Sequence, residues 1–184
     1  ERLEAWPKAS NIQELPKLPA KIAIIGGGIA GSALYYALKK RGADIEIFDN
    51  DIKGEHKASN NPRGLIMPRI DRQDTVEARL FKLAYLYAIR ELEAFEKNGF
   101  DKTIIKEFAK SKRDIEKYKI FKSQNPIDDE LLQIEDDYLI HKGAMAYPSK
   151  LCENLRGKNS IIEADIKSIK FDGEKWHLFY AQNV

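Results

Sequence analysis

The chain has 184 residues, 43% of them hydrophobic and 33% charged, which is typical of a folded globular protein and excludes a low-complexity or collagen-like chain. This length suits one domain, or one domain and part of a second. Lys and Arg number 31 against 29 Asp and Glu, so the net charge of +2 gives no strong field for nucleic acid or an acidic membrane surface. No stretch approaches the roughly 20 apolar residues that a membrane-spanning helix needs.

The single Cys152 cannot form an internal disulfide, and the sequence has no Asn-x-Ser/Thr acceptor for glycans. We therefore expect a cytoplasmic protein. The chain begins at Glu1, without an initiator Met or a signal-peptide pattern, which we interpret as a piece cut from a longer protein. Residues 1–20 are predicted to be an extended connector, because Pro7, Pro16 and Pro19 stand there among polar residues without an apolar period.

A strand, a glycine turn, a helix and a second strand are predicted between residues 21 and 51. An apolar run at 22–25 leads into Gly26-Gly27-Gly28-Ile29-Ala30-Gly31. A helical stretch follows and stops at Arg41-Gly42, a typical C-terminal glycine signal. Residues 45–49 form the second strand, so the segment predicts a Rossmann-like βαβ unit of an α/β fold.

The glycines and one acid of this unit match the dinucleotide-binding fingerprint. Gly26 permits a tight turn, Gly28 lets a pyrophosphate approach the backbone, and Gly31 lets the helix pack closely on the strand. Asp49 ends the second strand, 18 residues after Gly31, where a carboxylate accepts hydrogen bonds from ribose hydroxyls. Its negative charge disfavours a ribose 2′-phosphate, so the pattern predicts FAD or NAD and excludes NADP.

Residues 51–72 favour FAD over NAD. A simple NAD domain would continue with another βα unit within ~30 residues, whereas this segment is polar and irregular. Its sequence Ala58-Ser59-Asn60-Asn61-Pro62-Arg63-Gly64-Leu65-Ile66-Met67-Pro68 offers small side chains and a glycine, which suit close approach to a phosphate chain and a flat ring. From the residues alone, an ordinary surface loop is an equally good interpretation.

Three helices and three strands are predicted after residue 73. Thr75 can cap the first helix, whose apolar residues recur at three- and four-residue steps until Asn98-Gly99 ends it. A weaker helix is expected at 111–124, and Pro148 opens a third. Strands are expected at 161–164, 166–171 and 175–181, the last two forming a hairpin at Asp172-Gly173. We assign residues 21–72 to the first part of a cofactor-binding domain and 73–184 to helices and the start of a substrate-domain sheet.

These features, together with Gly143-Ala144-Met145-Ala146-Tyr147-Pro148, resemble the D-amino-acid-oxidase-like FAD-dependent oxidoreductases. The segment at 58–68 is further similar to the oxidoreductase half of the bifunctional proteins of tRNA 5-methylaminomethyl-2-thiouridine biosynthesis. The resemblance covers nearly all of residues 21–184. It implies FAD as the cofactor, tRNA as a partner, and an upstream methyltransferase domain in the same polypeptide, to which residues 1–20 would connect.

The resemblance also implies which residues contact FAD and substrate. The pyrophosphate would contact Gly26, Gly28, Ile29, Ala30 and Gly31, and the adenosine ribose would contact Asp49. Ala58 and Ser59 would meet phosphate oxygens. Gly64, Leu65 and Ile66 would lie against the ribityl chain and the flavin ring. Met145 and Tyr147 would lie near the substrate, although an ordinary core turn fits these residues as well. Arg63 and Arg69 flank the flavin segment, where a guanidinium fork can hold a carboxylate, or they simply face solvent.

For the whole enzyme, the resemblance implies oxidation of the carbon–nitrogen bond in the carboxymethylaminomethyl group of a tRNA wobble uridine. The substrate would lose a hydride to the cofactor, and water would cleave the resulting imine. The sequence shows no Ser/His/Asp arrangement, and His56, His141 and His177 are too dispersed to predict a metal site. Two alternatives stay open: an oxidase of a small amine such as glycine or sarcosine, and a non-catalytic nucleotide-binding module.

Two features depart from the family pattern. Tyr35 stands where the family has Ala or Gly on the helix face toward the strand, so we expect wider packing or an outward-turned ring. Family members return to the FAD-binding domain after the substrate domain, whereas this chain stops at Val184, so we expect a fragment that is inactive alone. Separately, residues 106–122 hold seven Lys/Arg against three acids, an excess suited to tRNA phosphates or to a solvated helix face.

Overall fold

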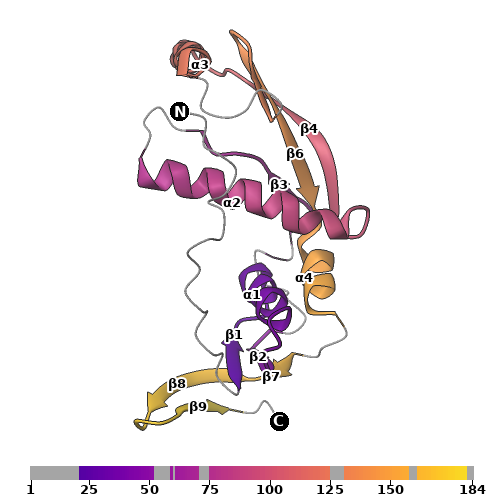
Figure 1. Cartoon of the computed structure of the whole chain (residues 1–184), viewed down its shortest axis with the longest axis vertical. Helices are drawn as coiled ribbons and strands as arrows, with labels where there is room; N and C mark the ends of the chain where they lie inside the picture. Colours follow the sequence, from indigo (N-terminus) through magenta and orange to yellow (C-terminus); the bar gives the residue numbers. More distant parts are fainter. Residues whose placement is uncertain are drawn as a thin grey trace, which may run out of the picture.

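The computed structural model describes residues 21–51, 59, 61–70, 75–124, 131–157 and 161–181. The connector expected at 1–20 and the expected phosphate contact Ala58 lie outside these residues. The described part is elongated, with a parallel sheet at one end and an antiparallel sheet at the other (Figure 1).

The βαβ unit forms as the sequence predicts. Strands β1 (Ile22–Ile25) and β2 (Ile45–Asp49) pair in parallel, and α1 (Ile29–Lys39) connects them. Two adjacent parallel strands need such a crossover connection, because a tight turn can join only antiparallel strands. The short strand β7 (Ile162–Glu163) pairs in parallel with the other edge of β2.

Tyr35 is accommodated inside this unit. Its side chain is 3% exposed and packs in one apolar cluster with Ile24 of β1 and Ile47 of β2. The ring therefore points toward the sheet, and the expected outward turn does not occur. The large side chain fills the layer between α1 and the sheet, where burial of an aromatic ring is strongly favourable.

The second sheet is antiparallel, and its strands were not predicted from the sequence. It contains β3 (Gly64–Ile66), β4 (Phe100–Phe108), β5 (Leu132–Ile134) and β6 (Tyr138–Ala146). Strand β4 pairs along the whole length of β6, while β3 and β5 pair with the other edge of β6. Met145, for which a core turn was one of two alternatives, lies in β6, and Tyr147 is the N-cap of the helix that follows.

The predicted helices are confirmed. Helix α2 (Val76–Leu92) begins after Thr75, whose side chain accepts a hydrogen bond from the Ala78 N–H at 3.2 Å, and a 3-10 turn, η2 (Glu93–Phe95), continues it. Helices α3 (Lys112–Gln124) and α4 (Pro148–Arg156) occupy the two remaining predicted positions. Pro148 suits the first turn of α4, because the amide hydrogen that it lacks has no partner there.

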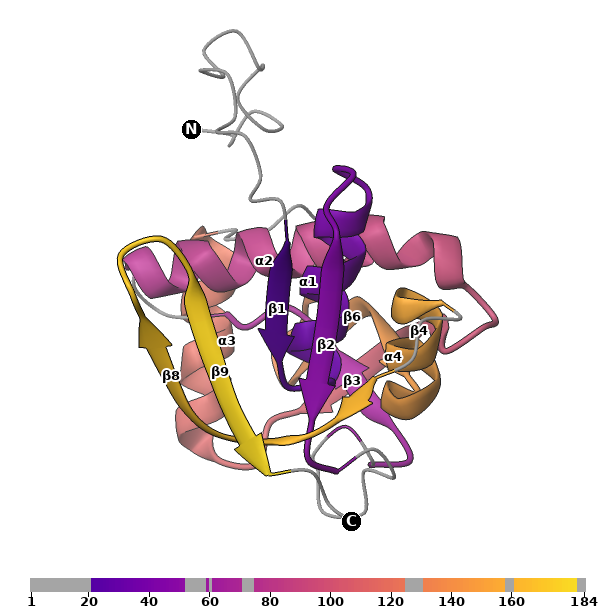
Figure 2. The ribbon, with the colours of Figure 1, turned by 90° about the horizontal axis from the view of Figure 1, so that it is seen from below.

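The predicted hairpin is also present, as β8 (Asp165–Phe171) and β9 (Trp176–Ala181). It lies on the face of the β1–β2 sheet opposite α1 (Figure 2), where the rings of Phe48 and Tyr180 are 6.2 Å apart. Residues 73–184 were expected to form helices and the start of a substrate-domain sheet. Within this range, β7 pairs with β2 and α4 packs beside α1.

His141 makes the stability of the second sheet dependent on pH. The residue is buried, its Nε2 lies 3.1 Å from Glu107 Oε2, and Arg69 and Lys117 line the same pocket. Burial lowers the pKa of His141 below its usual 6.5, although the Glu107 carboxylate opposes this shift. As the pH falls, the unfolded chain therefore takes up a proton on His141 at a higher pH than the folded chain does. The stability that the neutral imidazole contributes is fully present above pH 6.5 and is lost as the pH falls toward the lower folded-state pKa.

In the wild type, the midpoint urea concentration of unfolding should fall as the pH is lowered from about 7.5 to 5.5, and we expect this fall to be smaller in His141→Gln. Gln133→Ala, at an exposed position of β5 in the same sheet, changes no titratable group and should leave the wild-type slope unchanged. Equal slopes in the wild type and His141→Gln would show that His141 does not titrate differently in the folded chain.

Candidate FAD-binding site

The glycine turn between β1 and α1 requires glycine at two positions. Gly26 has a φ of +103°, in the left-handed region, and its N–H donates to the Phe48 carbonyl at 2.7 Å. A Cβ on Gly31 would lie 1.9 Å from the Gly26 carbonyl oxygen, which is far inside contact distance. These two glycines therefore close the turn and bring α1 against β1.

The first amide groups of α1 face a hydroxyl from a distant segment. Gly28 is the N-cap of α1 and gives no side-chain cap, while Ser59 Oγ accepts a hydrogen bond from the Ile29 N–H at 3.1 Å. A Cβ on Gly28 would meet only Ser59 Oγ, at 3.2 Å. Amide donors, the positive end of the helix dipole and a missing Cβ suit a pyrophosphate, so these residues fit the FAD that the sequence predicts. We call residues 26–31 together with Ser59 the phosphate cradle.

Asp49 lies beside the phosphate cradle and is 5% exposed. Its Oδ2 accepts a hydrogen bond from the Gly27 N–H at 2.5 Å, and its Oδ1 accepts one from the Asp51 N–H at 2.9 Å. The carboxylate thus stabilises the turn at the end of β2, next to the place where a dinucleotide's ribose would lie.

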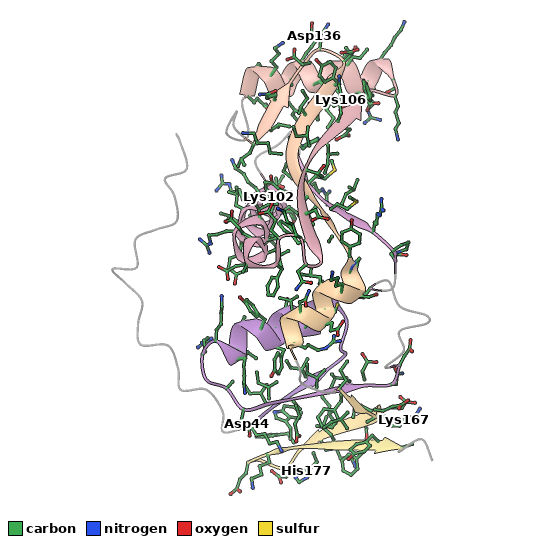
Figure 3. All side chains as sticks on the ribbon, turned by 90° about the vertical axis from the view of Figure 1, so that its right-hand side faces the viewer. Asp44, Lys102, Lys106, Asp136, Lys167 and His177 are labelled. Carbon is green, nitrogen blue, oxygen red and sulfur yellow. The ribbon has the colours of Figure 1, made fainter. Side chains whose placement is uncertain are left out.

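Asp49→Asn is expected to weaken FAD binding about tenfold, because the amide keeps one acceptor oxygen but turns an NH₂ group toward the other backbone donor. Titration of the apoprotein with FAD, followed by flavin fluorescence, measures this change. Asp44→Asn, on the exposed loop before β2 (labelled in Figure 3), is the matched control and should bind FAD like the wild type. Unchanged affinity in Asp49→Asn would remove Asp49 from the site.

The expected flavin and substrate residues meet in the second sheet. Gly64 pairs with Ala146, Leu65 with Met145, and Ile66 with Ala144. The Leu65 side chain is 62% exposed, so it offers an apolar surface beside Met145. The Arg63 guanidinium lies 5.8 Å from the centre of the Tyr147 ring. The structure therefore brings together Arg63, Leu65, Met145 and Tyr147 at one end of β6.

Arg69 lies apart from this group. Its guanidinium is 4.8 Å from the ring centre of Phe81 on α2, and it lines a pocket of about 280 Å³ with Glu107, Lys117 and His141. Of the two arginines that flank the expected flavin segment, Arg63 lies beside Tyr147 and Arg69 lies beside Phe81.

Three polar residues that the sequence analysis missed hold the phosphate cradle from behind. Ser149 Oγ donates to the Ser59 carbonyl at 3.0 Å. Arg156 Nη1 donates to the Gly27 carbonyl at 2.6 Å and to Ser32 Oγ at 2.8 Å. Ser32 is adjacent to Gly31 and on the buried side of α1, which a helical-wheel inspection would have shown, whereas nothing local in the sequence points to Arg156.

The lysine-rich segment 106–122 lies at the end of the molecule away from the βαβ unit (Figures 1 and 3). Acidic residues at 135–137 adjoin it, and Lys122 Nζ lies 3.3 Å from Asp136 Oδ1. Asp114 accepts hydrogen bonds from the Lys110 N–H and the Ser111 hydroxyl at the start of α3. Mixed charge of this kind favours the interpretation as a solvated helix face.

Within the described residues, no group of three or more His, Cys, Asp and Glu side chains is placed to hold a metal ion. Among the helices in the same part of the chain, none is long and apolar enough to cross a membrane.

Comparison with known proteins gives related sequences and folds. Residues 21–156 match the family model described as FAD dependent oxidoreductase. The tRNA 5-methylaminomethyl-2-thiouridine biosynthesis bifunctional protein MnmC of Maricaulis maris is 29% identical over 157 residues, which are 84% of this chain and 26% of that protein. The protein of the same name from Shewanella frigidimarina is 36% identical over 80 residues, or 44% of this chain and 12% of that protein. The chain thus spans about a quarter or less of these relatives.

Solved structures share the fold. Glycine oxidase from Geobacillus kaustophilus superposes with a TM-score of 0.64 at 15% identity, over 88% of this chain and 52% of that chain. L-alpha-glycerophosphate oxidase from Mycoplasma pneumoniae, with FAD bound, gives a TM-score of 0.65 at 16% identity, over 89% of this chain and 50% of that chain. At these identities the likeness concerns the fold alone.

Proposed function

The chain belongs to the FAD-dependent oxidoreductase family, and on this premise we propose that the whole protein oxidises a carbon–nitrogen bond of an amine. The observation that carries its cofactor part is the convergence of Gly28, Ser59 and Asp49, from three segments, at the N-terminus of α1, while the names of the relatives support the amine part. This arrangement offers backbone donors and space to a pyrophosphate, and an acceptor to a ribose.

The proposed substrate is a tRNA whose wobble uridine carries a carboxymethylaminomethyl group. Relatives at 28–38% identity bear names from tRNA 5-methylaminomethyl-2-thiouridine biosynthesis, which supports this choice over a free amino acid. Oxidation would remove two electrons and two protons from the NH–CH₂ group, as a hydride from the carbon and a proton from the nitrogen. Water would then add to the imine, leaving a primary amine on the uridine and releasing the carboxymethyl group as glyoxylate.

FAD would supply the oxidising equivalent, and the chain's own residues would hold it and the substrate. The phosphate cradle would bind the pyrophosphate, with Ala58 beside Ser59, and Asp49 would bind the adenosine ribose. Residues 64–66 would lie along the ribityl chain and the flavin ring. Met145 and Tyr147 would border the substrate, and Arg63 is the better placed of the two arginines to hold its carboxylate, since it lies beside Tyr147.

The proposal extends to the organisation of the polypeptide. The curated relatives are named bifunctional and are about four times as long as the matched segment, or longer. We propose that a methyltransferase domain lies upstream of residue 1 in the same polypeptide, that residues 1–20 connect it, and that residues 21–72 begin the FAD-binding domain. We further propose that the 184-residue chain is inactive by itself, because it spans only about a quarter of these relatives.

Turnover by the full-length protein tests the substrate. Loaded with FAD, it should convert tRNA bearing carboxymethylaminomethyl-uridine, and mass spectrometry of the digested nucleosides should show the primary amine. Glyoxylate release does not discriminate, because glycine oxidation also yields glyoxylate. The nucleoside mass is therefore the deciding measurement.

Glycine and sarcosine serve as competing substrates under the same conditions. Oxidation of either, with the tRNA nucleoside unchanged, would replace the tRNA proposal by the small-amine alternative. A protein that bound FAD but oxidised none of the three would leave only the non-catalytic interpretation of the sequence.

A further inference from the structure

Helix α4 connects the second sheet to the phosphate cradle. It begins at Pro148, directly after the end of β6, and lies beside α1 (Figure 3). Leu151 and Leu155 of α4 are buried in an apolar cluster with Ala146, and Tyr36 of α1 packs against it. The helix is therefore fixed to both elements that flank the cofactor site.

The first turn of α4 holds one side of the phosphate cradle. Ser149 Oγ donates to the Ser59 carbonyl at 3.0 Å, while the Ser59 hydroxyl accepts from the Ile29 N–H at 3.1 Å. Ser59 is thus fixed through its backbone by α4 and through its side chain by α1. A hydroxyl held in this way is already oriented toward the helix terminus at which a phosphate would bind.

The last turn of α4 holds the other side. Arg156 Nη1 donates to the Gly27 carbonyl at 2.6 Å and to Ser32 Oγ at 2.8 Å, and Ser32 Oγ donates to the same carbonyl at 3.0 Å. The Gly27 N–H is held in turn by Asp49. Both sides of Gly27 are therefore fixed, and a guanidinium charge lies beneath the turn that would carry the pyrophosphate.

We propose that α4 sets the shape of the phosphate cradle, with Ser149 and Arg156 as its positioning residues for FAD. Removing either contact leaves one side of the phosphate cradle free to move. Part of the free energy of FAD binding is then spent on ordering that side, which α4 already orders in the wild type, so the affinity falls. The cationic Arg156 adds a favourable field for the diphosphate. This inference rests on FAD binding by this turn and not on the identity of the oxidised substrate.

The test measures FAD affinity of the full-length protein, by flavin fluorescence, in Arg156→Met and Ser149→Ala. We expect the FAD dissociation constant to rise about tenfold in Arg156→Met and about threefold in Ser149→Ala. Lys150→Met, on the exposed side of the same helix, is the matched control and should bind FAD like the wild type. The rise in melting temperature on adding FAD should shrink in the two variants and persist in the control.

Two further variants separate positioning from simple loss of stability. Arg156→Lys keeps the charge but replaces the planar guanidinium by a compact ammonium on a shorter side chain, so its affinity should lie between those of the wild type and Arg156→Met. Ser32→Ala and Arg156→Met should be non-additive in a double-mutant cycle, because both act on the Gly27 carbonyl. Affinities within twofold of the wild type in the folded fraction of Arg156→Met and Ser149→Ala would overturn the inference, even if turnover on tRNA were confirmed.

Discussion

Replacing Gly31 with alanine is expected to unfold the βαβ unit under conditions in which the wild type is folded. The added Cβ would lie 1.9 Å from the Gly26 carbonyl oxygen and 3.0 Å from its carbon. Both are backbone atoms of a turn that the Gly26 N–H fixes to Phe48, so neither can move without breaking the turn. We expect a loss of about 3 kcal/mol or more in the free energy of unfolding, measured by urea denaturation, and FAD binding is lost with the fold.

Gly64→Ala is the matched control for this substitution. Its Cβ would meet only Pro148 Cγ, at 3.9 Å, which is ordinary contact distance. The free energy of unfolding of the apoprotein should change by less than about 0.5 kcal/mol. If Gly31→Ala unfolded at the same urea concentration as Gly64→Ala, α1 would not approach the turn as closely as the structure shows.

The βαβ unit was predictable because its signals are local. The apolar run, the three glycines and Gly42 lie within one stretch of sequence, and each has a conformational reason that acts on its neighbours. The same holds for the hairpin at Asp172-Gly173, where a positive φ at Gly173 suits the turn. Helix α2 was predicted from its cap and its period for the same reason.

The second sheet was missed because its strands stabilise one another only across long separations. Strand β4 shows no polar–apolar alternation, because the apolar Ile104 and Phe108 are exposed. Its partner in β6 is 32 residues away at the pair Glu107 and Leu139. In β6, Gly143 and Ala144 lower the apparent strand propensity. A Cβ on Gly143 would meet the Ile66 carbonyl at 2.5 Å, so this glycine allows β3 to approach. The need for glycine at position 143 is visible only once β3 and β6 are paired.

The candidate site divides in the same way. The glycines and Asp49 were identified from spacing, because a fingerprint encodes one turn and the strand after it. Arg156 was missed, since it lies 129 residues from Gly27 and contacts that residue through a carbonyl that every residue possesses. A backbone acceptor leaves no trace in the sequence, so a side chain that binds one is found only in the folded chain.

Gly28→Val is expected to give a folded protein that does not bind FAD, in contrast to Gly31→Ala. Gly28 has φ −67° and ψ −170°, an extended conformation that valine adopts without strain. Its added Cβ would meet only the Ser59 hydroxyl, at 3.2 Å, which needs to move by only a few tenths of an ångström. The apoprotein should therefore keep its circular dichroism spectrum and unfold within about 1 kcal/mol of the wild type.

The isopropyl group of Gly28→Val would nevertheless occupy the space above the first amides of α1, where the pyrophosphate must approach the backbone. We expect FAD to bind at least about a hundredfold more weakly, measured by gel filtration with FAD and by flavin fluorescence. Weakened binding in a folded protein assigns Gly28 to cofactor approach and Gly31 to packing, although both belong to one motif. Retained FAD in Gly28→Val would place the pyrophosphate elsewhere, and the roles proposed for Ser59, Asp49 and α4 would fail with it.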